Sequence, residues 1–124
     1  MRVGITEHPP WTLLGHEGPS GIEVQLLRQF AQQLQAEIAW QRGSESQLMG
    51  TLQGGALDVV IGGVKESTPW SSYVAMTRPY VTLNSEAYVM VVRQGENCWL
   101  LALDKFLHGH KAEINRLLES HIRP

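Results

Sequence analysis

The chain has 124 residues, of which 43% are hydrophobic and 18% are charged, and its formal net charge at pH 7 is −2. This length fits one compact domain with a real core, and the composition is that of a globular protein rather than a disordered one. Charges of both signs are scattered, so we expect no nucleic-acid partner. No apolar run approaches the ~20 residues that cross a bilayer, so we expect no membrane insertion.

The sequence says little about the cellular compartment. The opening residues MRVGIT enter a strand pattern directly, with no charged-then-apolar secretory leader. We therefore expect either a cytoplasmic protein or a chain whose leader has been removed. The single cysteine, Cys98, cannot form an internal disulfide and does not indicate a redox compartment.

The first strand and the first helix are marked by clear signals. Residues 2–6 alternate in polarity, and the two prolines of EHPPW then end the strand. A helix is predicted within residues 18–34, because an apolar stripe recurs there at helical spacing. Ser20 and Glu23 have the Ser-x-x-Glu spacing of a capping box, so we expect Glu23 to fold back on the first turn.

A second strand and helix, followed by a buried strand, complete an alternating pattern. Residues 37–41 predict a short strand, and a helix then begins behind Ser44, with Gln47 at capping-box spacing, and ends at the glycine pair 54–55. The near-continuous apolar run at 57–63 is typical of a strand inside a parallel sheet. Strands and helices that alternate with short connections predict an α/β domain, with a mostly parallel sheet flanked by helices.

The second half of the chain is predicted to continue the same domain, with a tight turn between two of its strands. Two further strands and a C-terminal helix are predicted at residues 73–77, 86–92 and 97–124. Gly109 can kink this helix. The short segment 83–85 (LNS) reads as a hairpin turn, because Asn84 tolerates left-handed backbone conformations. We find no repeat and no linker, and expect a single domain over residues 1–124.

No catalytic or metal-binding constellation is recognisable. The glycine pairs 54–55 and 62–63 match neither a P-loop nor a dinucleotide-binding pattern. His108 and His110 are two residues apart and would lie on different faces of a helix, whereas a metal site prefers a spacing of four. Cys98 opens a predicted helix, but no base can be assigned to it. We therefore expect no cofactor, no metal and no enzyme activity.

A small-molecule site is predicted at one edge of the sheet. Ligands of open parallel sheets gather beyond the carboxyl ends of the strands. The loops EHPPW and GGVKESTPW lie there and supply aromatic and polar groups of the kind that such sites use. The candidates are Trp11, Lys65, Ser67, Thr68 and Trp70. The alternative, that the two tryptophans only cover the sheet edge, remains open.

Several segments, taken in order, resemble an extracellular solute-binding protein of family 3 over nearly the whole chain. They are RVGITEHPPW, GPSGIEVQLLRQFAQQLQAEI, LDVVIGG, TPWSSYVAMTRPY and GENCWLLALDKFL. The family consists of periplasmic or extracellular receptors of amino-acid-type ABC transporters, in which two α/β lobes of the type II periplasmic-binding fold close on a ligand. The resemblance therefore implies a small polar solute, an ABC transporter permease as partner and a location outside the cytoplasm.

The resemblance also implies that one lobe is missing. Residues 1–82 and 86–124 resemble the two parts of a Rossmann-like lobe 1, whose C-terminal helix packs back on it. The second lobe belongs between them, where this chain has only the turn 83–85. One wall of a clamp buries one side of a ligand, so we expect binding in the millimolar range or weaker, worth roughly 4 kcal/mol or less.

The ligand-facing residues can be carried over by position. They are Trp11, Gly63, Lys65, Ser67, Thr68 and Trp70, with Arg78 and Tyr80 near the crossover between lobes. Amino-acid-binding members hold the ligand carboxylate with an arginine in a Thr-Pro-x-Arg context. Here Trp70 or Ser71 stands in that place, which argues against the usual recognition of an α-amino acid.

Two other functions remain open. Loss of the second lobe would expose a cleft face with Trp11, Trp70 and Tyr80, the kind of apolar patch that attracts a partner. A second copy of the chain is the simplest partner, through a two-fold interface or exchange of the strand at 86–92. A sensor domain is the third alternative, and it would need a membrane anchor.

Overall fold

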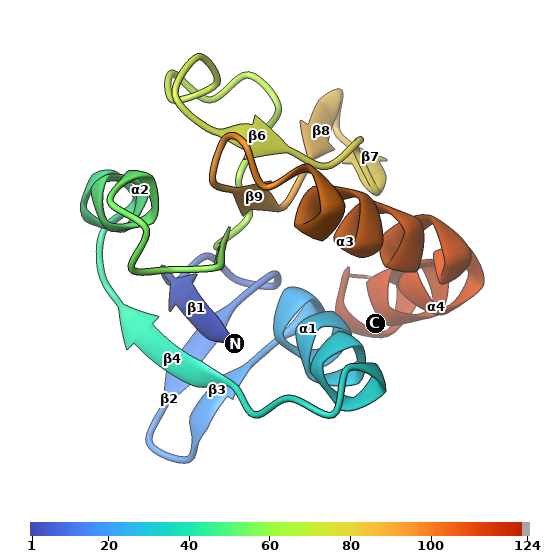
Figure 1. Cartoon of the computed structure of the whole chain (residues 1–124). Coiled ribbons are helices and arrows are strands. Elements are labelled where there is room, and N and C mark those ends of the chain that lie inside the picture. The colour runs from blue at the N-terminus through green and yellow to red at the C-terminus, as the bar shows by residue number, and fades with distance from the viewer. Residues whose placement is uncertain (123–124) are drawn as a thin grey trace.

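The computed structural model describes residues 1–122, so the last two residues of the expected 1–124 domain lie outside the described part. Its centre is a five-stranded sheet in the order β4-β1-β5-β9-β6 (Figure 1). These strands are Arg2–Ile5 (β1), Ala39–Arg42 (β4), Val59–Ile61 (β5), Ala75–Met76 (β6) and Val91–Val92 (β9). β1 pairs in parallel with β4 and β5, whereas β9 is antiparallel to β5 and β6. The predicted α/β class with a mostly parallel sheet is confirmed.

Helices cover both faces of this sheet. They are Ile22–Gln33 (α1), Glu45–Gln53 (α2), Asn97–Gly109 (α3) and Lys111–Ile122 (α4). α1, α3 and α4 lie on one side and α2 on the other (Figure 1). Successive side chains of a strand point to opposite faces, so β5 places Val59 and Ile61 in the larger core beneath α1, and Val60 in the smaller core beneath α2.

The C-terminal segment forms two helices where the sequence predicted one with a possible kink. α3 ends at Gly109, and the Nδ1–H of His110 donates to the carbonyl oxygen of Phe106 at 2.7 Å. α4 then turns back against α1, with Ile114 and Leu117 in the larger core. The expectation that the C-terminal helix packs back on the domain is confirmed.

One of the two predicted capping boxes is present. At α2, the Ser44 hydroxyl accepts a hydrogen bond from the Gln47 amide, and the Gln47 side chain accepts one from the Ser44 amide. At α1 the prediction was wrong, because the N-cap is Gly21 and no side chain caps this end. Ser20 belongs to β3 instead, and the carboxylate of Glu23 is buried against other backbone donors.

Two small hairpins flank the sheet. The first joins Leu13–Gly15 (β2) to Gly18–Ser20 (β3), and the second joins Val81–Leu83 (β7) to Glu86–Tyr88 (β8). In the second, Leu83 pairs with Glu86, which leaves a two-residue loop with φ of 53° at Asn84 and 66° at Ser85. Positive φ at both positions defines the tight hairpin turn that the sequence predicted at Asn84.

Replacing Ser85 with glycine is expected to raise the free energy of unfolding by about 0.5 to 1 kcal/mol. Ser85 has a left-handed backbone conformation that costs a residue with a Cβ atom, and the change creates the favoured Asn-Gly turn. Urea unfolding measures the difference. Ser71→Gly is the control, because Ser71 is an exposed turn residue without a positive φ and should gain nothing. A Ser85→Gly protein no more stable than the parent would contradict the prediction.

Candidate functional site

A hollow of about 250 Å³ lies at the carboxyl ends of β1 and β5. It is lined by His8, Glu45, Gly62, Gly63, Lys65, Ser67, Thr68 and Pro69. These residues come from the loop after β1, the start of α2 and the loop after β5. Open α/β sheets bind ligands at this edge. The hollow is therefore our candidate site, and we call residues 62–68 the solute loop.

Four of the predicted site residues meet at this hollow. Gly63, Lys65, Ser67 and Thr68 all lie in the solute loop and line the same space. The Lys65 ammonium lies 3.6 Å from the Glu86 carboxylate on β8, and both side chains are partly exposed. The Thr68 hydroxyl accepts a bond from the Trp70 amide at 3.4 Å, which holds the turn that follows.

The other four predicted residues lie elsewhere. Trp11 is 2% exposed and packs in the larger core against Tyr80 and Tyr88, at ring-centre distances of 6.3 and 4.3 Å. Tyr80 is 7% exposed and also belongs to that core. Arg78 forms an ion pair with Asp104 of α3 at 2.8 Å and lines a separate hollow. Trp70 is half-buried and packs against the smaller core.

The structure adds lining residues that the sequence reading did not select, notably His8 and Glu45. The Nδ1–H of His8 donates to the carbonyl oxygen of Gly62 at 3.0 Å, so this side chain is held against the solute loop. Glu45 is the first residue of α2, directly after β4. The rule that ligands gather at the carboxyl ends of strands applies to β4 as well, and it could have identified Glu45.

Behind the hollow lies a fully buried carboxylate, Glu23 of α1. One of its oxygens accepts bonds from the amides of Gly62 at 3.0 Å and Gly63 at 2.8 Å. The other accepts a bond from the Tyr80 hydroxyl at 2.7 Å. The two amides at the end of β5 therefore point inward to Glu23 and not into the hollow.

Burial dominates the ionisation of this cluster. It raises the pKa of Glu23 above its usual 4.5, although the bonds from Tyr80, Gly63 and Gly62 and the nearby His8 act in the opposite direction. Burial, together with the Glu23 carboxylate, raises the pKa of Tyr80 well above 10. The Tyr80 hydroxyl thus keeps its proton and remains a donor.

The raised pKa of Glu23 predicts a pH dependence of stability. Between about pH 4.5 and the raised value, the folded state binds more protons than the unfolded state, so the stability contributed by this group falls as pH rises. The slope approaches about 1.4 kcal/mol per pH unit within that window. Urea unfolding of the parent and of Glu23→Gln at each pH isolates this group, because glutamine does not titrate. Parallel stability curves for the two proteins would contradict the prediction.

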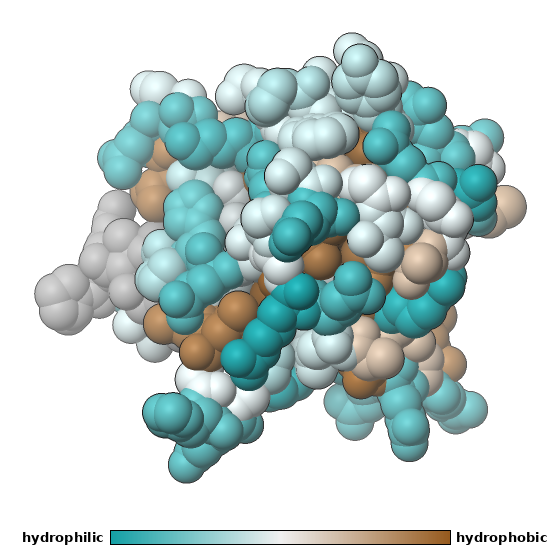
Figure 2. Space-filling view, turned by 90° about the vertical axis from the view of Figure 1, so that its left-hand side faces the viewer, coloured by the Kyte–Doolittle hydropathy of each residue, from teal (hydrophilic) through white to brown (hydrophobic). Residues whose placement is uncertain are grey.

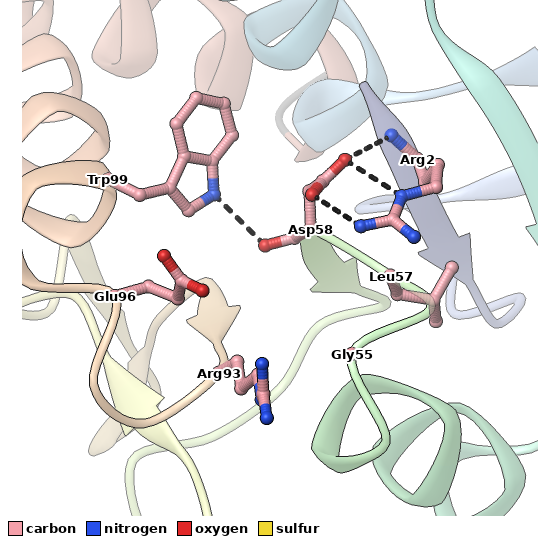
Figure 3. Close-up of a pocket in the computed structure, with 7 residues that line it drawn as sticks. All are labelled: Arg2, Gly55, Leu57, Asp58, Arg93, Glu96 and Trp99. Carbon is pink, nitrogen blue, oxygen red and sulfur yellow. Dashed lines mark hydrogen bonds and ion pairs between the residues drawn. The ribbon is translucent and has the colours of Figure 1, made fainter.

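A second hollow, of about 220 Å³, lies at the opposite end of the sheet (Figure 3). Its lining residues are Arg2, Gly55, Leu57, Asp58, Arg93, Glu96 and Trp99. The Asp58 carboxylate accepts bonds from the amide and the guanidinium of Arg2, and its carbonyl accepts one from the Trp99 indole at 3.0 Å. These bonds join β1 to α3, so we interpret this hollow as a structural junction.

Among residues 1–122, no group of three His, Cys, Asp or Glu side chains is placed to hold a metal ion. In the same residues, no helix has both the length and the apolar character to cross a membrane.

Solved structures share this fold. The arginine-bound form of domain 1 from TmArgBP superposes with a TM-score of 0.79 at 23% identity, over 88% of this chain and 91% of that one. An ancestral arginine-binding protein bound to arginine gives a TM-score of 0.82 at 16% identity, over 98% and 97% of the two chains. At these identities the likeness shows the fold alone. It agrees with a single lobe of a periplasmic-binding protein.

The sequence comparisons identify the family. Membrane-bound lytic murein transglycosylase F of Vibrio cholerae serotype O1 is 29% identical over 68 residues, which are 54% of this chain. The match spans only 13% of that relative's length. The model of the bacterial extracellular solute-binding proteins, family 3, matches residues 1–123. The chain therefore belongs to the family 3 bacterial extracellular solute-binding proteins, as its sequence segments suggested.

Proposed function

We propose that the chain is a single solute-binding lobe of a transport receptor, and that the hollow at the carboxyl ends of β1 and β5 is one wall of its solute site. The observation that carries this proposal is the convergence of Lys65, Ser67 and Thr68 with Glu45 at that edge, in a family whose members bind solutes. A few converging polar groups in a hollow are what fixes the orientation of a small ligand.

The lobe organisation extends this proposal. Residues 1–82 and 86–124 form lobe 1, and the turn 83–85 replaces the second lobe. In this assignment, the cognate partner is an ABC transporter permease, the location is periplasmic or extracellular, and the chain is a receptor without enzyme activity. The family of the chain supports the receptor role and the extracellular location.

The chemistry of the hollow limits the solute. No arginine lines it among the described residues, and Arg78 is bound to Asp104. The amides of Gly62 and Gly63 are held by Glu23 and cannot hold a ligand carboxylate. The groups that remain are the Ser67 and Thr68 hydroxyls, the Lys65 ammonium, the His8 imidazole and the Glu45 carboxylate. We infer a small polar solute that is recognised through hydroxyl, amide or amine groups.

An NMR titration tests the site. L-Arginine and L-glutamine, which carry the amine and amide groups inferred above and are named in solved structures of similar fold, serve as probes of ¹⁵N-labelled protein. We expect saturable shifts confined to the solute loop and the start of α2, with a dissociation constant in the millimolar range or weaker. Ser67→Ala should weaken binding, whereas Lys105→Ala on α3 should not change it. Micromolar binding by a monomer would contradict the expectation that a single lobe binds weakly. Chemical shift changes confined to other parts of the protein would contradict the proposed location of the site.

A second candidate function is self-association through the same end of the molecule. The exposed cleft face expected from Trp11 and Tyr80 is not present, because both side chains are buried in the larger core. Tyr73 is 57% exposed and lies edge-on to Trp70, at a ring-centre distance of 6.0 Å, in the segment after the solute loop. By contrast, on the face that carries α2, hydrophobic residues reach the surface only in separate areas (Figure 2). A dimer in dilute solution that Tyr73→Ser disrupts would support this candidate. A monomer at all concentrations would exclude it.

A further inference from the structure

The solute loop is attached to the β7–β8 hairpin along its outer side. The Glu66 amide donates to the Ala87 carbonyl at 2.8 Å, and the Val89 amide donates to the Val64 carbonyl at 3.0 Å. The ion pair between Lys65 and Glu86 adds a side-chain contact between the same two segments. The loop that lines the hollow therefore rests on the hairpin.

A buried connection joins the same two segments from the inside. Tyr80 directly precedes β7, and its hydroxyl donates to one oxygen of Glu23. The other oxygen of Glu23 accepts from the Gly62 and Gly63 amides, at the start of the solute loop. A single carboxylate on α1 thus links the hairpin to the loop.

The orientation of the peptide groups at Gly62 and Gly63 determines the inner wall of the hollow. Because the Gly62 and Gly63 amides face Glu23, the Gly62 carbonyl is free to accept the bond from His8, which lines the hollow. An apolar residue at position 23 would avoid the cost of burying a charge, but it would leave both amides without a partner. The carboxylate is therefore suited to fixing the loop, because it supplies the acceptor that both amides need.

We propose that Glu23 and Tyr80 are positioning residues of the solute site, which fix the peptide orientation at Gly62 and Gly63 and connect it to the position of the β7–β8 hairpin. Neither side chain touches the hollow, and both act through the backbone of the solute loop. This inference rests on the proposed function, since it assigns the two residues to the same site.

Tyr80→Phe is the decisive variant, because it removes only the hydroxyl that bonds Glu23. Tyr88→Phe is its matched control. Tyr88 is similarly buried and packs on the same Trp11 ring, but its hydroxyl makes no hydrogen bond within the described residues. Amide hydrogen exchange, measured against a core amide of the same protein, is expected to accelerate at Gly62 and Gly63 by about tenfold in Tyr80→Phe. The amide proton shifts of both glycines should move as well. Tyr88→Phe should change neither.

Titration with L-arginine and L-glutamine separates this inference from the proposed function. Weaker binding by Tyr80→Phe than by Tyr88→Phe, together with the exchange effect, supports the inference. Unchanged exchange and shifts at Gly62 and Gly63 would overturn it, whether or not a solute binds. Altered exchange with unchanged affinity would also overturn it, because the network would then not serve the site. If the parent protein binds neither probe while the exchange effect appears, the proposed function fails for these solutes and the fixing of the loop is supported.

Discussion

Replacing Gly63 with alanine is expected to lower the free energy of unfolding by at least about 3 kcal/mol. Gly63 has a φ of 64°, and an added Cβ atom would lie 2.6 Å from Cδ1 of Trp11 and in conflict with the His8 ring. Neither neighbour can move easily, because Trp11 is packed in the core and His8 is bonded to Gly62. The steric conflict adds to the cost of a left-handed backbone.

Urea or thermal unfolding monitored by circular dichroism measures this loss. Gly50→Ala is the matched control, since Gly50 lies inside α2 and an added Cβ there meets nothing within 4 Å. It should gain up to about 1 kcal/mol, because alanine favours the helix. A Gly63→Ala protein as stable as the parent would show that the solute loop adapts and that its backbone is not fixed.

Replacing Glu23 with alanine is expected to cost about 3 kcal/mol or more of unfolding free energy. The substitution leaves two buried amides and a buried hydroxyl without their acceptor, and it opens a cavity beside the core. Glu23→Gln is the comparison, because its side-chain oxygen can still accept from the Gly62 and Gly63 amides. It should fold with a stability closer to that of the parent.

Denaturant unfolding of both variants at one pH tests this second prediction. The difference in unfolding free energy between Glu23→Ala and Glu23→Gln reports the contribution of the hydrogen bonds and packing, because both substitutions remove the charge. If Glu23→Ala lowered the unfolding free energy by less than about 1 kcal/mol, water or a rearranged loop would have to accept the bonds from the two amides and the Tyr80 hydroxyl. The proposed positioning role of Glu23 would then lose its basis.

The elements of the fold were predictable because their signals are local. The alternation of apolar stripes and apolar runs indicated the parallel strands β1, β4 and β5, and Ser44 marked the start of α2. The turn at Asn84 was also readable, since few residues accept a left-handed conformation. The apolar run 86–92 was predicted as one strand, whereas it forms β8 in the hairpin and β9 in the main sheet. Period-two patterning does not show where a strand changes partners.

The site was only partly predictable, because its geometry depends on contacts distant in sequence. Topology placed Lys65, Ser67 and Thr68 at the edge of the sheet where the hollow lies. Sequence could not show that the Trp11 ring turns into the core, since residues in a loop have no fixed periodicity. Glu23 was misread because its spacing from Ser20 fits a local cap, while its actual donors lie 39 and 40 residues away. Glu23 thus bonds residues distant in the sequence and does not cap its own helix.

The two-residue tip of the β7–β8 hairpin has a consequence for how this protein can be extended. Asn84 and Ser85 are exposed and lie beyond the last paired residues, so the chain can be opened there without disturbing either core. The entropic cost of a longer loop grows only slowly with its length, and exposed loop tips accept inserted domains well. The tip is therefore a natural splice point, at which a reporter or another folded domain can be grafted close to the solute loop.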